Sequence, residues 1–318
     1  MSNSDVLLVA PLPHAPTMAL LNERFRIHRL WDAKDKDALI ASIKDTCVAA
    51  ATSGLASMSG ELIRALPRLK MISVFGVGYD GVDIGAAKSA GIHVTNTPDV
   101  LNECVADTAW ALILATMRGT AFNDRFVRAG NWLTGKAPLT NRVWGETIGI
   151  VGLGRIGKAI ARRAQGFGMT VAYHGRSQQK DMPFEYFPKL VDLARAARVL
   201  VVVTPGGKET ENMIDAQVLN ALGTKGYLIN VSRGSTVDES ALIKALEDQR
   251  IAGAGLDVFA DEPRVPDKLL ALDNVVLQPH VGSATHHTRA AMGKLMVDNL
   301  EAFFANKPLL TEVAETRD

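Results

Sequence analysis

Gly152-Leu153-Gly154-Arg155-Ile156-Gly157 is the stretch that decides the fold of this chain. It follows an apolar run at 147–151, which predicts a buried strand, and it precedes residues 158–164, which have helical character. In that context a GxGxxG pattern indicates a dinucleotide-binding turn. The first glycine permits a tight turn, the second lets a pyrophosphate approach the backbone, and the third lets helix and strand pack closely. The free N–H groups and the positive dipole end of the helix then face the phosphates.

The next apolar run, at 168–173, indicates which dinucleotide is preferred. An NAD site usually places Asp or Glu about 20 residues beyond the glycines, where it binds the ribose 2′-hydroxyl. No acidic residue occurs between Thr170 and Lys180, and Arg176 and Ser177 stand there instead. A guanidinium and a hydroxyl can bind a 2′-phosphate with charge-assisted hydrogen bonds, whereas a carboxylate would repel it. The sequence therefore favours NADP(H), with NAD(H) as the alternative.

Strand-like and helical runs alternate over the first hundred residues. The predicted strands are 6–10, 46–51 and 71–75, and the predicted helices are 37–43 and 61–66. Such alternation is typical of a parallel sheet covered by helices. The pattern breaks at Asn96–Asp99, a candidate hinge, and residues 102–117 then predict a long apolar helix.

From residue 148 onward, strands recur at intervals typical of βαβ units. They are predicted at 148–151, 171–173, 199–203, 227–231, 254–258 and 275–277, and a long returning helix at 285–305. Six strands, the first followed by GxGxxG, fit a Rossmann domain. We therefore expect an α/β fold of two Rossmann-like domains with doubly wound parallel sheets and the active site in the interdomain cleft. Residues 1–98 with 287–318 would form the substrate-binding domain, and 99–286 the dinucleotide-binding domain.

Composition excludes several classes of protein. The chain has 318 residues, is 47% hydrophobic and 22% charged, and carries a net charge of +1, so neither nucleic acid nor a membrane is an expected partner. Its only cysteines are Cys47 and Cys104, which we interpret as small buried residues rather than nucleophiles. No CxxC or HExxH spacing occurs, so no metal site is expected. The cysteine count and the absence of a signal-peptide pattern favour a cytoplasmic location.

Three ionisable residues stand where predicted strands of the second domain end. The strand at 227–231 is followed by Arg233, the strand at 254–258 by Glu262, and the strand at 275–277 by His280. Open α/β sheets bind ligands at this carboxyl edge. An arginine can bind the carboxylate and carbonyl of a 2-oxo acid, a histidine can protonate the carbonyl oxygen as hydride arrives, and an acid can orient the imidazole and favour its charged form. Each residue alone could be a packing or turn residue; together they predict reduction of a 2-oxo acid.

From about Ala51 to its C-terminus the chain resembles the D-2-hydroxyacid dehydrogenases, the family that contains glyoxylate/hydroxypyruvate and hydroxyphenylpyruvate reductases. The matching stretches, besides the glycine motif, are 73–80, 94–98, 105–109, 230–234, 255–259 with 262–263, and 279–283. The resemblance implies that Arg233, Glu262 and His280 are the catalytic set. It also implies a D-2-hydroxy acid product, and a homodimer whose interface lies near residues 102–147, where Trp132 and Trp144 would be interface or core aromatics.

The same resemblance implies further site residues. The substrate carboxylate would meet the backbone N–H groups of Val77 and Gly78 together with Arg233, and Leu55 would lie in the substrate loop. Asp257 would hold the nicotinamide carboxamide, and Thr108 would contact the cofactor from its helix. The remaining candidate cofactor contacts, beside the glycine motif with Arg155 and Ile156, are Thr204, Pro205, Val231, Arg233, His280 and Ser283.

Substrate identity is less constrained than the family. The loop Thr52–Met58 has small residues and no basic group, which argues against a phosphorylated substrate. Hydroxypyruvate and glyoxylate are therefore the first candidates. Two alternatives stay open: an NAD-dependent dehydrogenase of another D-2-hydroxy acid, and a dinucleotide-sensing, corepressor-like binding protein that keeps the same residues.

Overall fold

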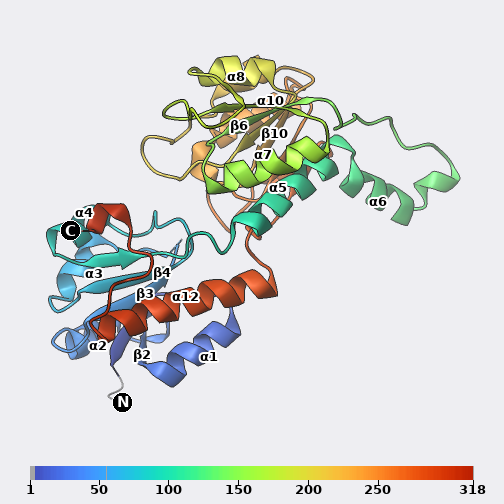
Figure 1. Ribbon diagram of the computed structural model, residues 1–318. Helices are drawn as coiled ribbons and strands as arrows, with labels where there is room; N and C mark the ends of the chain where they lie inside the picture. The colour runs from blue at the N-terminus through green and yellow to red at the C-terminus, as the bar shows by residue number, and fades with distance from the viewer. Residues whose placement is uncertain (1–3, 55, 318) are drawn as a thin grey trace. The chain divides into compact units, whose positions relative to one another are not determined.

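A computed structural model of the protein describes residues 4–54 and 56–317, so the predicted substrate-loop residue Leu55 lies outside the described residues. Contacts within the chain divide it into two compact units (Figure 1). Unit 1 comprises Met1–Leu101 with Ala284–Asp318, and unit 2 comprises Asn102–Ser283. Within the part of the chain that the structure describes, none of the helices has the length and apolar character of a membrane span.

Unit 1 is built on a five-stranded sheet with the order β2-β1-β3-β4-β5. Every neighbouring pair is parallel. The strands are β1 (Asp5–Leu8), β2 (Arg26–Arg29), β3 (Ala49–Ser53), β4 (Met71–Phe75) and β5 (His93–Thr95). The helices are α1 (Ala15–Arg24), α2 (Lys36–Ile43), α3 (Gly60–Ala65), α4 (Ile84–Ser89) and α12 (His286–Phe304). Parallel strands are covered by helices on both faces, which is why β4 is buried along its whole length.

The prediction for unit 1 starts one strand too early and misses two others. The strand predicted at 46–51 begins only at Ala49, because the N–H groups of Thr46 and Cys47 both donate to the carbonyl of Ile43 and prolong the end of α2. The edge strands β2 and β5 were not predicted at all. The strand β2 has exposed arginines at both ends, so its sequence lacks a continuous apolar run.

Unit 2 has a seven-stranded sheet with the order β12-β11-β10-β9-β6-β7-β8, and its neighbouring strands are again parallel. The strands are β6 (Thr147–Val151), β7 (Thr170–His174), β8 (Glu185–Tyr186), β9 (Val199–Val202), β10 (Tyr227–Asn230), β11 (Gly253–Leu256) and β12 (Val275–Leu277). The predicted α/β class with two Rossmann-like sheets is confirmed. The prediction of six strands missed β8, an edge strand of two residues.

The helices of unit 2 cover this sheet and build its carboxyl edge. They are α5 (Asn102–Met117), α6 (Thr120–Arg128), α7 (Arg155–Gly166), α8 (Leu190–Ala196), α9 (Ala216–Leu222), α10 (Glu239–Glu247) and α11 (Asp267–Leu270). Strand order reverses between β6 and β9, so their carboxyl ends flank the crevice where a doubly wound sheet binds ligands. The glycine motif lies directly after β6, at this crevice.

Residues 120–146 form an arm that projects from the body of unit 2 (Figure 1). The arm carries large apolar side chains in contact with solvent: Trp132 is 70% exposed, Leu133 92%, Leu139 101% and Trp144 65%. The two tryptophans are therefore not core residues in this chain, which corrects one of the two interpretations made for them. Cys47 is buried as expected, but Cys104 is only half-buried.

Candidate active site

The glycine turn after β6 has the geometry of a phosphate cradle. Gly152 has a φ of 99°, a region that favours glycine, and its N–H donates to the carbonyl of His174 at 2.9 Å. A Cβ at Gly157 would stand 2.2 Å from the carbonyl oxygen of Gly152, so helix and turn can pack only without a side chain there. A Cβ at Gly154 would meet nothing within 4 Å. The second glycine therefore borders open space that a pyrophosphate can occupy.

Helix α7 begins without a side-chain cap. Its N-cap residue is Gly154, and no acidic residue stands in its first turn. Six other helices begin with a side-chain oxygen bonded to their N–H groups, from Asp35, Ser59, Asp83, Asp215, Asp238 and Thr285. The helices α1, α6, α8 and α11 lack such a cap, as α7 does. Because Gly154 supplies no capping side chain, the start of α7 fits an anionic ligand. The residues present fit a dinucleotide at this turn.

The loop after β7 lies beside the glycine turn and exposes its basic group. Arg176 and Ser177 are both exposed. The side-chain amide of Gln179 donates to the carbonyl of Leu153 at 2.7 Å, and its N–H donates to the hydroxyl of Tyr173 at 2.7 Å. The first bond ties Gln179 to the GxGxxG turn, and the second ties it to β7. Nothing in the sequence pattern singled out Gln179.

Glu262 and His280 form a close pair at the carboxyl edge of the unit 2 sheet. Nδ1 of His280 lies 2.7 Å from Oε2 of Glu262, while Oε1 accepts a hydrogen bond from the N–H of Phe259 at 3.1 Å. Burial by itself would raise the pKa of Glu262. The hydrogen bond and charge of His280, the N–H of Phe259 and the charge of Arg233 together outweigh burial and lower that pKa. Glu262 is therefore a carboxylate at neutral pH.

Arg233 reaches the same edge from the next strand. Its guanidinium donates to the carbonyl of Ser232 at 2.8 Å, and its charge acts on Glu262. A Cβ at Gly234 would stand 1.9 Å from the carbonyl carbon of Phe259. The turn that carries Arg233 therefore packs backbone against backbone on the loop that carries Glu262, and the glycine permits this contact. The structure brings all three predicted catalytic residues to one edge.

Asp257 anchors the loop that carries the histidine. Its side chain is buried, and its two oxygens accept hydrogen bonds from the N–H groups of Val281 at 2.7 Å and Gly282 at 2.8 Å. Burial raises the pKa of Asp257. The two N–H groups and the charge of His280 act in the opposite direction, because they favour the ionised carboxylate, but burial outweighs them. His280 has a φ of 52°, left-handed backbone that costs a residue with a Cβ about 1–3 kcal/mol. The N–H of His280 also donates to the Asp257 carbonyl at 2.8 Å, so Asp257 stabilises this strained conformation.

The predicted carboxylate-binding turn belongs to unit 1 and follows β4. The side-chain amide of Asn96 donates to the carbonyl of Val77 at 2.8 Å, and the hydroxyl of Thr97 accepts from the N–H of Gly76 at 3.1 Å. The N–H groups of Val77 and Gly78 donate to no acceptor among the residues that the structure describes. Two adjacent donors held in place in this way suit an anion such as a carboxylate.

The other predicted cofactor contacts lie around the same edge of unit 2. Thr108 projects from α5, and its hydroxyl donates to the carbonyl of Gly282 at 3.4 Å. Thr204 follows β9, and its methyl group would be 3.0 Å from a Cβ at Gly152. Pro205, Val231 and Ser283 follow β9, β10 and β12 respectively.

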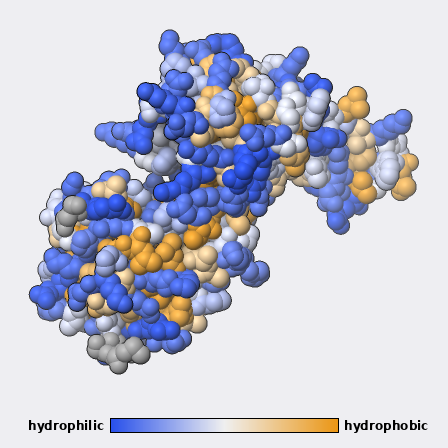
Figure 2. All heavy atoms as spheres, in the orientation of Figure 1, coloured by the Kyte–Doolittle hydropathy of each residue, from blue (hydrophilic) through white to orange (hydrophobic). Residues whose placement is uncertain are grey.

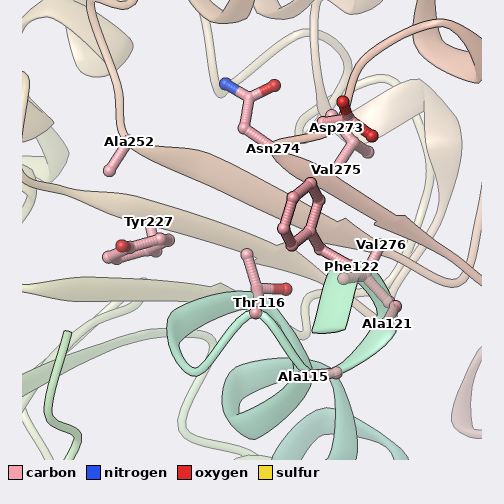
Figure 3. Close-up of a pocket in the computed structure, with 11 residues that line it drawn as sticks. Ala115, Thr116, Ala121, Phe122, Tyr227, Ala252, Asp273, Asn274, Val275 and Val276 are labelled. Carbon is pink, nitrogen blue, oxygen red and sulfur yellow. The ribbon is translucent and has the colours of Figure 1, made fainter. Parts of the chain in front are cut away.

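A small cavity lies at the other end of the unit 2 sheet and is not this site. Its volume is about 80 Å³, and its lining includes Thr116, Phe122, Tyr227 and Asn274 (Figure 3). The buried hydroxyl of Thr116 has no hydrogen-bond partner among the described residues. A liquid water takes about 30 Å³, so the cavity can hold ordered water that satisfies this hydroxyl and is far too small for a dinucleotide.

Comparisons with known proteins agree on one family. Residues 110–282 match the family described as D-isomer specific 2-hydroxyacid dehydrogenase, NAD binding domain. The chain is 46% identical over 313 residues to glyoxylate/hydroxypyruvate reductase A of Arabidopsis thaliana, covering 98% of this chain and 100% of that protein. It is 46% identical over 293 residues to hydroxyphenylpyruvate reductase of Plectranthus scutellarioides, covering 92% and 94%. The crystal structure of NADPH-dependent glyoxylate/hydroxypyruvate reductase from Sinorhizobium meliloti with NADP and malonate matches with a TM-score of 0.93 at 46% identity, covering 99% and 98%.

Proposed function

This chain belongs to the D-isomer specific 2-hydroxyacid dehydrogenase family, and on that premise we propose that it reduces glyoxylate and hydroxypyruvate to the D-2-hydroxy acids with NADPH. It is an oxidoreductase with a dinucleotide-binding domain. The observation that carries the proposal is the His280–Glu262 pair, 2.7 Å apart, beside Arg233 at the carboxyl edge of the Rossmann sheet. The reaction consumes one proton and one hydride for each carbonyl reduced.

The cofactor supplies the hydride when it is bound at the glycine turn. The open face of Gly154 and the uncapped start of α7 would accept its pyrophosphate, with Arg155 and Ile156 in that first turn. Arg176 and Ser177 would bind a 2′-phosphate, which supports NADPH over NADH. The Sinorhizobium meliloti relative is described as NADPH-dependent and as a complex with NADP.

Further contacts would hold the rest of the dinucleotide. Asp257 would accept from the carboxamide, since each of its oxygens has a second lone pair beyond the bond to the loop. The other residues assigned to this role are Thr108, Thr204, Pro205, Val231, Arg233, His280 and Ser283.

The substrate carboxylate would be bound by Val77, Gly78 and Arg233, with Leu55 against the rest of the substrate. The N–H groups of the turn donate to no other acceptor in the described chain, and an arginine binds a carboxylate with two parallel bonds. Holding the acid at its carboxylate leaves the neighbouring carbonyl carbon as the position that accepts hydride.

His280 would deliver the proton. Its Nδ1 faces Glu262, so Nε2 is the nitrogen that can donate to the carbonyl oxygen of the substrate. Glu262 orients the ring and stabilises its positive charge before the proton leaves. In the oxidative direction the same nitrogen would accept the proton from the hydroxyl group.

The deciding experiment is a panel of initial rates with purified protein. Glyoxylate, hydroxypyruvate, hydroxyphenylpyruvate and 3-phosphohydroxypyruvate are each assayed with NADPH and with NADH. We expect the highest kcat/KM for glyoxylate or hydroxypyruvate with NADPH. A higher value for hydroxyphenylpyruvate would move the substrate assignment toward the Plectranthus relative. Tight NADPH binding without turnover of any acid would instead favour a dinucleotide sensor.

We further propose that the chain forms a homodimer through the arm at 120–146. The arm exposes the large apolar side chains of Trp132, Leu133 and Leu139, and Figure 2 shows orange, hydrophobic atoms along the arm. Exposed apolar patches of this kind mark interaction surfaces. Light scattering of the protein, with Leu133→Asp as the disrupting variant, tests the assembly.

We also propose that the protein is located in the cytoplasm. Both cysteines, Cys47 and Cys104, are free thiols, which supports a reducing compartment.

A further inference from the structure

Unit 1 holds a half-buried guanidinium that no carboxylate balances. Arg289 lies in the first turn of α12, with its Cζ 5.6 Å from the centroid of the Phe75 ring. Within residues 4–54 and 56–317, no acidic side chain forms an ion pair with it. Arg24, by contrast, contacts Glu23 at 3.4 Å and Glu301 in α12 at 3.6 Å. Cations removed from water are normally paired, so the exception points to an anion that binds from outside the protein.

This guanidinium lies at the carboxyl edge of the unit 1 sheet. The hydroxyl of Ser73 in β4 donates to the carbonyl of Met296 in α12 at 3.4 Å. Arg289, two turns earlier in α12, contacts Phe75 at the end of β4. These two contacts show that α12 runs antiparallel to β4. Phe75 immediately precedes the turn at 76–78. The unpaired cation and the two free N–H groups therefore belong to the same edge of the same unit.

Two imidazoles lie near Arg289, and neither can balance its charge. The charges of Arg289 and of His286, which stands three residues earlier in α12, both act on His14 in the loop after β1. Burial, then the charges of Arg289 and His286, lower the pKa of His14. The first turn of α12 contains no acidic residue, and its dipole end is positive. Burial also lowers the pKa of Arg289, which fits a guanidinium held partly out of water.

We propose that Arg289 is a substrate-binding residue, whose guanidinium supplies the positive charge of unit 1 for the carboxylate of the 2-oxo acid. The proposal rests on the proposed function, because its ligand is the substrate of that reaction. The substrate loop Thr52–Met58 and the turn at 76–78 contain no basic side chain. Without Arg289, those two segments would offer the carboxylate only neutral groups. The Phe75 ring keeps the guanidinium in place through a cation–π contact.

The test compares Arg289→Gln, Arg289→Lys and the control Arg24→Gln, which removes the same charge beside the other end of α12. With NADPH saturating, we expect Arg289→Gln to raise the KM for glyoxylate and hydroxypyruvate by about 10–100-fold, the loss typical of one charge-assisted hydrogen bond. The KM for NADPH and the unfolding midpoint should stay close to those of the unmodified protein. Arg289→Lys should recover part of the loss, and Arg24→Gln should show none.

A titration without turnover separates binding from catalysis. Malonate, a non-reducible dicarboxylate, is titrated calorimetrically into each protein saturated with NADP⁺. Its Kd should rise in Arg289→Gln by a factor similar to that of KM. An unchanged Kd and KM in Arg289→Gln would overturn the proposal. Parallel losses of kcat, NADPH affinity and stability in both Arg289 variants would overturn it too, because they indicate a packing role.

The same titration keeps the two proposals apart. If the unmodified protein reduces no 2-oxo acid, the proposed function fails. Weaker malonate binding in Arg289→Gln would then still establish Arg289 as a carboxylate-binding residue, and unchanged binding would refute it. If the unmodified protein is active and Arg289→Gln has an unaltered KM, only the role of Arg289 fails.

Discussion

Nδ1 of His280 lies 2.7 Å from Oε2 of Glu262, although the two residues follow different strands of the unit 2 sheet. The pair is half-buried, with 30% of the His280 side chain and 22% of the Glu262 side chain exposed. Partial burial strengthens the attraction between imidazolium and carboxylate relative to a pair in open water. The remaining exposure leaves Nε2 able to meet a ligand.

Replacing His280 with Ala should remove the proton donor and leave the glycine turn intact. General acid catalysis contributes about 10²–10⁴-fold to a rate, so kcat/KM for glyoxylate should fall by that factor. The Kd for NADPH, measured by fluorescence titration, should rise by a much smaller factor, because His280 is only one of the assigned cofactor contacts and the glycine turn lies on another strand. His287→Ala, at the exposed start of α12, is the control and should keep normal activity. Near-normal turnover in His280→Ala would overturn the whole catalytic assignment.

Replacing Glu262 with Gln should slow reduction without weakening cofactor binding. Burial alone would raise the pKa of Glu262, but the hydrogen bond and charge of His280 outweigh it, so Glu262 is a carboxylate that orients the ring through Nδ1 at 2.7 Å. Gln keeps the size of the side chain but removes its negative charge, so kcat should fall about 10–100-fold, the loss typical of one charge-assisted hydrogen bond. The Kd for NADPH should stay near that of the unmodified protein. Equal kcat values for the two proteins would contradict the pairing.

The acid side of the same pair affects stability. A carboxyl group whose pKa is lowered by folding contributes stability above its unfolded value, and this contribution is lost as pH falls through the lowered folded value. Chemical denaturation of the unmodified protein should therefore show a loss of stability below about pH 4.3, the ordinary range of Glu. The difference in unfolding free energy between Glu262→Gln and the unmodified protein should shrink over that range.

Replacing Arg176 with Ala should weaken NADPH without affecting NADH. Arg176 is exposed in a loop that Gln179 ties to the glycine turn, so its loss removes charge without removing structure. The KM for NADPH should rise by about tenfold or more, as expected for one charge-assisted hydrogen bond. NADH kinetics serve as the internal control. Equal catalytic efficiencies for the two cofactors in the unmodified protein would show that this loop does not select the 2′-phosphate.

Two glycines of one motif should respond oppositely to alanine. At Gly157 a Cβ would meet the Gly152 carbonyl oxygen at 2.2 Å, so Gly157→Ala should destabilise the protein by about 1–3 kcal/mol. At Gly154 a Cβ would meet nothing within 4 Å, so Gly154→Ala should keep the unfolding midpoint but weaken NADPH binding. Denaturant titration and calorimetry measure the two effects. Unimpaired NADPH binding in Gly154→Ala would place the pyrophosphate elsewhere.

Removing the Asp257 carboxylate should release the loop that carries His280. The N–H groups of Val281 and Gly282 would lose their acceptor, and each unsatisfied buried donor costs about 1–3 kcal/mol. Asp257→Ala should therefore lower both stability and kcat. Asp261→Ala, at an exposed acid paired with Arg264, is the matched control and should leave both near normal. Equal behaviour of the two variants would remove the anchoring role from Asp257.

Local sequence signals predicted much of the fold. The elements β4, β12 and α5 have the bounds that were predicted, and the strand–glycine–helix unit lies where GxGxxG placed it. The strand β4 and the helix α5 were predictable because each is a continuous apolar run with many buried residues. The strand β12 is a short edge strand, but it was predictable because all of its residues are apolar. The strands β2, β5 and β8 were missed because edge strands are short and partly solvated, so hydrophobic periodicity is weak in them.

By itself the sequence determined the class of fold and the position of the glycine turn. It also determined which ionisable residues lie at the carboxyl edge of the second sheet. It could do so because turn conformation and strand burial depend on residues close together in the chain. Only the tertiary structure decided which of those residues touch. Three contacts join segments that are distant in sequence: the hydrogen bonds from residues 281–282 to Asp257, the hydrogen bond from Gln179 to Leu153, and the cation–π contact of Arg289 with Phe75. Contacts of that kind depend on how helices and strands pack, and packing leaves no periodic signal in the chain.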